Sequence, residues 1–231
     1  LDQKHKKENL VKQNRAAEEQ YRQEQNSQES LVQELKKKGR NFISQIKRKQ
    51  KKTNEINKEI QKLIREAIIA SNKAAGKKRN SKVFSLTPED QLISDNIIAN
   101  KGKLPWPVEQ GVVIQRFGRQ PHPVVKTAII QSNGVTIATP KNAQARAVFD
   151  GKVMSIIGFK GSNPSVLIQH GNYITTYSNL GEVYVTKGQK VIPKEAIGKV
   201  FTNPETGKTE LKFSVFKAST PVNPKGWIYR M

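Results

Sequence analysis

The first 82 residues contain no proline, and their sparse apolar residues recur with the period of a coiled-coil seam. Ala17 and Tyr21 stand four residues apart, and Leu31 and Leu35 repeat this spacing fourteen residues later. A narrow stripe with a period of roughly 3.5 residues is typical of a coiled coil, whereas a helix packed on a globular core shows a wider apolar face. We therefore predict a basic coiled-coil-type helical arm over residues 1–82.

The seam of the arm is thin and changes register along its length. The change falls between Leu35 and Phe42, next to Gly39, where we predict a stutter or a kink. Because an isolated helix of this composition is marginal in water, we expect the arm to need a partner helix, supplied either by a missing N-terminal segment or by another chain. Residues 60–75 are richer in Ile, Leu and Ala, which predicts a short helix that docks on another surface.

A further helix is predicted after a basic linker at residues 76–81. Thr87 is a favourable N-cap, Pro88 suits the first helical position, and acidic residues follow in the first turn. We therefore predict a helix over residues 89–99, inside a connecting segment at residues 83–103.

The charge of the chain is strongly unbalanced, with 41 Lys and Arg against 19 Asp and Glu, a formal net charge of +22. Such a field favours anionic partners such as nucleic acid, acidic lipid, wall polymer or an acidic protein surface, and composition alone does not choose among them. Cations without an acid among them gather in the arm: Lys36, Lys37, Lys38, Arg40, Lys47, Arg48, Lys49, Lys51 and Lys52. They form either a solvated flank or a contact site for phosphate or lipid head groups. A series of interleaved aromatic residues for base stacking is absent, so nucleic acid is not an expected partner.

Cysteine is absent from the chain, which excludes disulfides, thiolate metal ligands and a cysteine nucleophile. This fits a bacterial protein outside the cytoplasm, although a cytosolic protein can also lack cysteine. No apolar run approaches the roughly 18–20 residues that span a bilayer. The chain begins with Leu1 and shows no signal-peptide segment, so we interpret it as a trimmed fragment of a periplasmic or other extracytoplasmic protein.

After residue 104 the sequence changes to proline, glycine and β-branched residues in alternating patterns, which predicts short strands. Asp150-Gly151 and Gly171-Asn172 each separate two such runs and are predicted as hairpin turns. Further strands are predicted at residues 182–185, 190–192, 196–201 and 209–216. The fold class is therefore α+β, a long coiled-coil-type helix and short helices followed by an antiparallel all-β domain over residues 104–231.

Several motifs of the β region follow one another in a recognisable order. They are Pro105-Trp106-Pro107, Arg116-Phe117-Gly118, Asn133-Gly134-Val135-Thr136, Ala145-Arg146-Ala147-Val148, Tyr177-Ser178-Asn179-Leu180, Lys187-Gly188-Gln189 and Val222-Asn223-Pro224. The series resembles the lysostaphin/LytM-type zinc endopeptidase domain over residues 104–228. The Pro-Trp-Pro motif, with the coiled coil and helix before it, resembles a narrower group, the EnvC-type murein hydrolase activators. That group carries a catalytically inactive domain of this kind.

The resemblance implies positions for a zinc site, and this sequence has another residue at each of them. The family binds zinc with the His and Asp of an HxxxD motif and the second His of an HxH motif, which correspond to Ser132, Thr136 and Lys212. The two catalytic histidines correspond to Asn179 and Glu210. Hydroxyls are poor zinc ligands and a protonated lysine repels the ion, so we predict no metal, no cofactor and no peptidase activity.

The three histidines of the chain do not replace these ligands. His5 lies in the predicted arm, His122 lies between two prolines, and His170 ends a predicted strand. None is near another in the sequence, so we predict structural or incidental roles for all three.

Alternation along residues 209–216 places Glu210 and Lys212 on one face of a strand, where the family has its substrate groove. Two interpretations of these residues and of Asn179 stay open. They either fill an abandoned metal site, with a charge pair, or form the floor of a partner-binding groove.

The resemblance implies a non-catalytic activator of murein hydrolases in cell division and peptidoglycan remodelling. Its groove would bind an N-acetylmuramoyl-L-alanine amidase, and its arm would respond to a membrane division complex. The helix at 60–75 or the helix at 89–99 would occlude the groove until the arm is moved. Two alternatives stay open. One is an active zinc metallo-endopeptidase of the LytM type with unusual ligands, and the other is a module that binds peptidoglycan or another anionic polymer through its charge.

Overall fold

The computed structural model describes residues 2–76, 82–122, 125–158 and 162–231, so the predicted linker lies outside the described residues except for Gly76. The chain forms two compact units, Leu1–Lys51 and Lys52–Met231. The boundaries predicted near residues 82 and 103 stay predictions. Within the described ranges, no helix combines the length and the apolar character that crossing a membrane requires.

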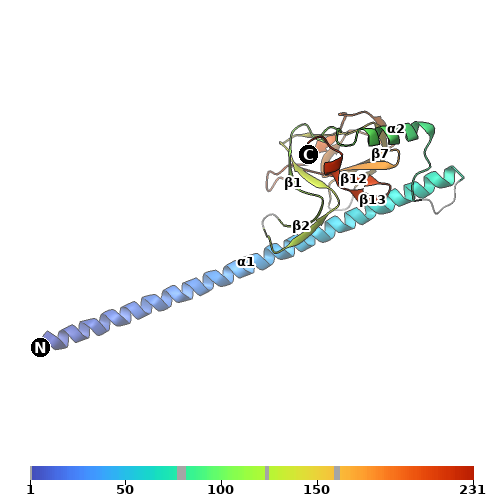
Figure 1. Ribbon diagram of the computed structural model, residues 1–231. Coiled ribbons are helices and arrows are strands. Elements are labelled where there is room, and N and C mark those ends of the chain that lie inside the picture. The colour runs from blue at the N-terminus through green and yellow to red at the C-terminus, as the bar shows by residue number, and fades with distance from the viewer. Residues whose placement is uncertain (1, 77–81, 123–124, 159–161) are drawn as a thin grey trace. The chain divides into compact units, whose positions relative to one another are not determined.

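Helix α1 (Asp2–Ala74) is a single helix of 73 residues (Figure 1). It continues through Gly39, where, outside its own helix, no described atom lies within 4 Å of the place a Cβ would take. An exposed glycine costs a helix only about 1 kcal/mol relative to alanine, which the turns on both sides tolerate. The prediction of a separate short helix at residues 60–75 is wrong, because these residues form the last turns of α1.

The last turns of α1 pack on the β domain within the second compact unit. Ile60, Ile64 and Ile68 lie about one helical turn apart and are at most 3% exposed. They share an apolar cluster with Phe84, Ile157, Leu167, Ile174, Phe216 and Ala218. Asn72, fully buried, accepts a hydrogen bond from Ser85 Oγ (2.6 Å) and so ties the end of the helix to the segment that follows.

Helix α2 (Pro88–Ala99) begins and ends where the capping pattern predicts. Thr87 Oγ1 accepts a hydrogen bond from Asp90 N (3.2 Å), and Pro88 opens the helix. Ile97 is fully buried in the main apolar core, and α2 lies beside β7 (Figure 1). The backbone N–H of Asn172 donates to Ser94 Oγ (3.5 Å), which joins α2 to the turn after β7.

The strands of residues 104–231 are short and pair only antiparallel within the described sheets. They are β1 (Val112–Gln115), β2 (Gly118–Pro121), β3 (Ile129–Ser132), β4 (Val135–Ala138), β5 (Gln144–Arg146), β6 (Gly151–Ile157), β7 (Ser165–His170), β8 (Tyr173–Ser178), β9 (Leu180–Val183), β10 (Lys190–Val191), β11 (Ala196–Val200), β12 (Glu210–Lys217) and β13 (Thr220–Val222). A 3-10 turn, η1 (Pro224–Gly226), follows. The predicted fold class, helices followed by an antiparallel all-β domain, is confirmed.

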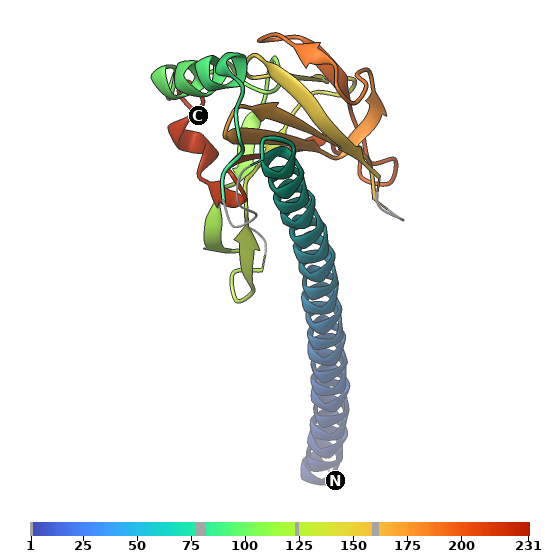
Figure 2. The ribbon, with the colours of Figure 1, turned by 90° about the vertical axis from the view of Figure 1, so that its right-hand side faces the viewer.

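The main sheet has eight strands, in the order β1-β4-β12-β8-β7-β6-β10 with β13 beside β12. A three-stranded sheet, β5-β11-β9, and the pair β2-β3 complete the domain. One face of the main sheet packs into the core, which includes Val135, Tyr177 and Phe213. The other face meets the last turns of α1, whose approach to the strands is visible in Figure 2.

One of the two predicted hairpins is confirmed and the other is wrong. At Gly171-Asn172, β7 and β8 pair directly, with His170 opposite Tyr173 and Gly171 at a φ of 64°. Around Asp150-Gly151 the flanking strands enter different sheets, since β5 pairs with β11 and β6 pairs with β7 and β10. Gly151 is needed for another reason, because a Cβ there would lie 2.5 Å from the carbonyl oxygen of Gln169.

Candidate functional site

A polar row crosses the middle of the eight-stranded sheet on the face away from the core. Lys212 of β12 lies opposite Thr136 of β4 on one side and opposite Ser178 of β8 on the other. Gln115 of β1 lies opposite Thr136. Directly opposite residues of antiparallel strands share a face, so these four side chains lie on one surface. We call it the outer face, because the intervening residues of β12 point into the core.

Glu210 and Lys212 lie on the outer face together, as the alternation predicts, because Leu211 and Phe213 are fully buried in the core. Glu210 is half-buried and lies opposite Ala138, whereas Lys212 is exposed. The sheet thus places a carboxylate and an ammonium group two residues apart on the floor of the outer face.

Thr136 has its hydroxyl already in use. The residue is 5% exposed, and its Oγ1 donates a hydrogen bond to Gln115 Oε1 (3.3 Å). The buried hydroxyl is therefore part of the packing between β4 and β1.

Ser132 lies outside the row, at the turn that leads from β3 into β4. Its Oγ donates to the carbonyl oxygen of Gly134 (2.9 Å) and so stabilises that turn. Gly134 itself leaves no room for a side chain, since a Cβ would lie 2.1 Å from Ser214 Oγ. Ser132 thus supports the close approach of β4 to β12.

Asn179 links two parts of the rim of this face. Its Nδ2 donates to the backbone carbonyl oxygen of Glu210 (2.7 Å), and its Oδ1 accepts from Asn163 Nδ2 (2.6 Å). Its φ of 73° lies in the left-handed region, which asparagine tolerates better than most residues. Both ends of the amide are therefore hydrogen-bonded, one to the backbone of Glu210 and the other to the side chain of Asn163.

These residues do not fit a catalytic zinc ion, which requires three good protein ligands and one open position. The hydroxyls of Ser132 and Thr136 are weak ligands and are bonded to Gly134 and Gln115. The ammonium group of Lys212 would repel a metal cation. Among the described residues, no three His, Cys, Asp or Glu side chains gather closely enough to hold a metal ion.

His170 lies on the core side, far from this chemistry, in a buried chain of hydrogen bonds. Its Nδ1 donates to the carbonyl oxygen of Asp150 (2.6 Å), so its Nε2 accepts from Thr175 Oγ1 (2.8 Å). Thr175 Oγ1 lies 3.3 Å from the hydroxyl of Tyr177, which also accepts from Val148 N (3.0 Å). Burial lowers the pKa of His170 to about 4 and raises the pKa of Tyr177, so both side chains stay neutral.

The other two histidines give no ligand set either. His122 Nδ1 accepts a hydrogen bond from Val125 N (3.2 Å), while its neighbour Pro123 lies outside the described residues. His5 lies in α1.

The last turns of α1 cover part of the outer face next to the polar row. Phe216 lies opposite Ile174, and both belong to the cluster that buries Ile64. Thr176, one position closer to the row, is 2% exposed, whereas Lys212 is exposed. Of the two helices predicted to occlude the groove, only the end of α1 is placed on this face; α2 contributes Ile97 to the core cluster instead.

The comparisons with known proteins agree with this geometry. Residues 131–224, which include β4, β8 and β12, match the model of a family described as peptidase family M23. This part of the chain is therefore similar to domains of the M23, or LytM, type.

Parts of the chain are similar to curated proteins and to solved structures. The murein hydrolase activator EnvC of Escherichia coli is 25% identical over 133 residues, 57% of this chain and 30% of the relative. The peptidoglycan DD-endopeptidase ShyA of Vibrio cholerae is 32% identical over 106 residues, 46% of this chain and 24% of the relative. A zinc-containing peptidase from Vibrio cholerae superposes with a TM-score of 0.46 at 27% identity, covering 54% of this chain and 40% of that one. The chain spans 24% to 36% of the length of the curated relatives it matches.

The sequence did not reveal which neighbours complete the polar row. Gln115 and Ser178 join it through strand register, and register between distant strands has no local pattern that reports it. The bonds of Asn179 to Asn163 and Glu210 likewise depend on tertiary structure. For Ser178, its place next to Asn179 in the Tyr177-Ser178-Asn179-Leu180 motif was the available hint.

Proposed function

We propose that this chain is a non-catalytic activator of murein hydrolases, which binds an N-acetylmuramoyl-L-alanine amidase through the outer face of its LytM-type domain. The observation that carries the proposal is the polar row around Lys212, built on an M23-type scaffold with hydroxyls and amides already bonded within the protein. The likeness to a murein hydrolase activator supports the same role. Such a protein acts in the periplasm during cell division and peptidoglycan remodelling.

The chemistry of the outer face supports binding rather than hydrolysis. Lys212 is exposed and Glu210 is half-buried, so both charges are within reach of a partner. Polar side chains beside a buried apolar patch are typical of protein interfaces, where the apolar centre contributes affinity and the polar residues fix the register. The apolar patch here is the cluster around Phe216 and Ile174.

The end of α1 supports a regulated form of this activity. Ile60, Ile64 and Ile68 occupy the apolar patch beside the polar row, so a partner that binds this patch would have to displace them. Displacing α1 would expose that patch, and a division complex that moves the arm would then control activation. A helix of this kind shifts the balance between two states only by its differential contacts in each.

The test is amidase activity on purified murein with and without this protein. The double substitution Ile60→Asp with Ile64→Asp should displace the end of α1 and raise stimulation. Ile69→Asp is the matched control, because Ile69 lies on the same helix and is 38% exposed. Equal stimulation by all three proteins would reject occlusion by α1, and an absence of stimulation in every form would reject the activator role.

A second pair of variants tests the outer face. Lys212→Ala should reduce stimulation, whereas Lys217→Ala should not, since both lysines are exposed on β12 but only Lys212 lies in the row. Two results would favour the alternatives. Stoichiometric zinc with chelator-sensitive cleavage of a cell-wall peptide would indicate an active endopeptidase. Salt-sensitive sedimentation with murein and no effect on an amidase would indicate a binding module.

A further inference from the structure

Acidic and basic side chains are segregated into two successive blocks along α1, and the proposed activator function does not explain this pattern. Residues 16–35 contain five glutamates and one arginine, whereas residues 36–51 contain eight lysines and arginines and no carboxylate. The acidic block consists of Glu18, Glu19, Glu24, Glu29 and Glu34, and the basic block of Lys36, Lys37, Lys38, Arg40, Lys47, Arg48, Lys49 and Lys51. The two blocks are contiguous and of similar length.

Apolar residues of the seam lie exposed across the junction of these blocks. Leu31 is 56% exposed, Leu35 is 58% exposed and Phe42 is 57% exposed. Tyr21, further along the acidic block, is 69% exposed. Large apolar side chains repeated at coiled-coil spacing on an exposed helix are stabilised when a second helix covers them.

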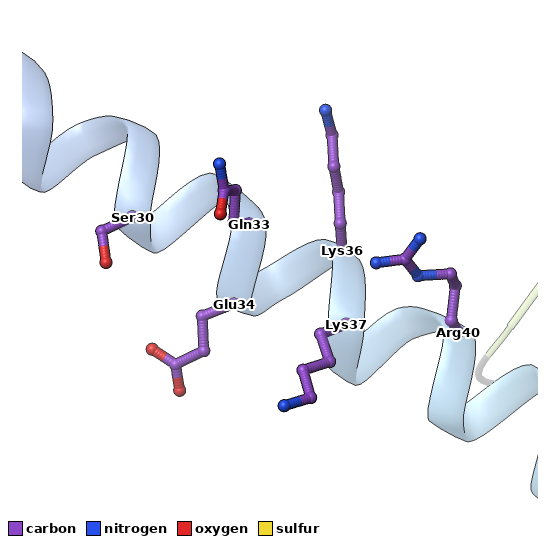
Figure 3. A pocket seen from close by; sticks show the side chains of 6 residues that line it. All are labelled: Ser30, Gln33, Glu34, Lys36, Lys37 and Arg40. Atoms are coloured by element: carbon purple, nitrogen blue, oxygen red, sulfur yellow. The ribbon is translucent and has the colours of Figure 1, made fainter.

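Charged side chains flank the seam on both sides of the helix. Figure 3 shows Lys36 and Arg40 extending to one side of α1, and Glu34 and Lys37 extending to the other. Within the helix, Glu34 bonds Lys38 (2.7 Å), which neutralises one cation at the junction. The remaining cations of the basic block exceed what the helix itself can pair, so the block favours an acidic neighbour.

We propose that the arm pairs antiparallel with the arm of a second copy of this chain, each acidic block lying along the basic block of the other. A parallel pair in register would place acid on acid and base on base, which repels. The antiparallel register places Leu31 of one copy opposite Leu35 of the other, so the numbers of opposite residues add to about 66. In this register Glu18 lies near Arg48 of the other copy, and Glu19 lies near Lys47. The acidic block of one copy thus supplies the partner that the basic block of the other favours.

Disulfide trapping of the full chain tests the orientation of the pair. Because the chain has no native cysteine, only the introduced cysteines can form a disulfide. Tyr21→Cys mixed with Gln45→Cys should form a disulfide-linked dimer under mild oxidation, because these positions add to 66. Tyr21→Cys alone should not, since its two copies lie about 24 residues, or roughly 36 Å, apart along the pair. A dimer trapped by Tyr21→Cys alone and not by the mixture would overturn the antiparallel arrangement.

Charge-reversal variants test whether the charged blocks stabilise the dimer. Light scattering measures the mass, which for a dimer is about twice the 26.0 kDa of one chain. Glu18→Lys with Glu19→Lys should weaken dimerisation roughly tenfold, and so should Lys47→Glu with Arg48→Glu. Mixing the two variants should restore it, because every reversed pair then meets its complement. A chain that is monomeric at all concentrations and salt levels, or a dimer that neither variant weakens, would reject the proposal.

Discussion

The two faces of the eight-stranded sheet are built by different rules. The core face is apolar and almost fully buried, and a chain of hydrogen bonds links Tyr177, Thr175, His170 and the carbonyl oxygen of Asp150 within it. The outer face alternates an exposed charge, Lys212, with bonded hydroxyls and an apolar patch under α1. The comparison teaches that the core face sets the strand register. The outer face can then change its chemistry while β4, β12 and β8 stay aligned.

The strongest test of this difference uses adjacent residues of β12. Phe213→Ala should lower the free energy of unfolding by about 4 kcal/mol, because it removes a fully buried aromatic ring and leaves a cavity. Lys212→Ala should change it by about 0.5 kcal/mol or less, since the side chain is exposed. Urea denaturation of both variants measures the contrast. Similar losses for the two would contradict a core face that dominates stability.

The buried chain of the core face should make stability depend on pH. The pKa of His170 is about 4 in the folded protein against 6.5 for an ordinary histidine, so the unfolded chain binds the proton more readily. The neutral form therefore contributes its full stability above pH 6.5, and about 3 kcal/mol of it is lost as the pH falls from 6.5 to 4. Below pH 4 this contribution should level off.

Denaturation of the parent protein and of His170→Gln at several pH values isolates the effect, since carboxylates titrate in both. The parent should lose more stability than the variant between pH 6.5 and 4. NMR titration of the folded parent provides a second measurement that does not depend on the variant folding. A His170 pKa near 6.5 would show that the ring is not held neutral by burial.

The cover of the outer face by α1 should contribute less. Ile64→Ala removes a fully buried side chain from the cluster with Phe216 and Ile174, and should lower stability by about 2 to 3 kcal/mol. Ile69→Ala, at a position 38% exposed on the same helix, should have a much smaller effect. In Ile64→Ala, amide hydrogen exchange should become faster in residues 60–72 while exchange in β12 changes less. If residues 60–72 were equally protected in Ile64→Ala and Ile69→Ala, the packing of α1 on the sheet would not depend on Ile64.

Local patterns were sufficient for those parts of the fold that local chemistry determines. The Thr87 cap, the Gly171-Asn172 hairpin and the alternation of Glu210 and Lys212 were predicted correctly, because each depends on residues close in sequence. The hairpin at Asp150-Gly151 was wrong, because its glycine serves a close approach to Gln169 from another strand. The helix at residues 60–75 was misjudged because its higher content of Ile, Leu and Ala reflects packing on the β domain and not a break in α1.

The roles assigned to Thr136, Asn179 and Lys212 from the motif order stay predictions. The register that places Thr136 opposite Lys212 depends on pairing between distant strands, which has no local pattern. That Asn179 supports the backbone could not be predicted, since Asn163 and Glu210 are 16 and 31 residues away in sequence.

The last prediction concerns Asn179, whose side-chain amide makes two hydrogen bonds at the rim of the outer face. Asn179→Ala should lower stability by about 1 to 2 kcal/mol, since the carbonyl of Glu210 and the amide of Asn163 each lose a partner. Asn179→Gly loses the same bonds but suits the φ of 73°, so it should be less destabilising than the alanine variant by up to about 1 kcal/mol. Thermal and urea denaturation of the pair separate the two contributions. If glycine were as harmful as alanine, the hydrogen bonds alone would account for asparagine at this position. A milder glycine variant would show that backbone conformation also favours asparagine there, so that the rim of the outer face is shaped by its fold as well as by its polar contacts.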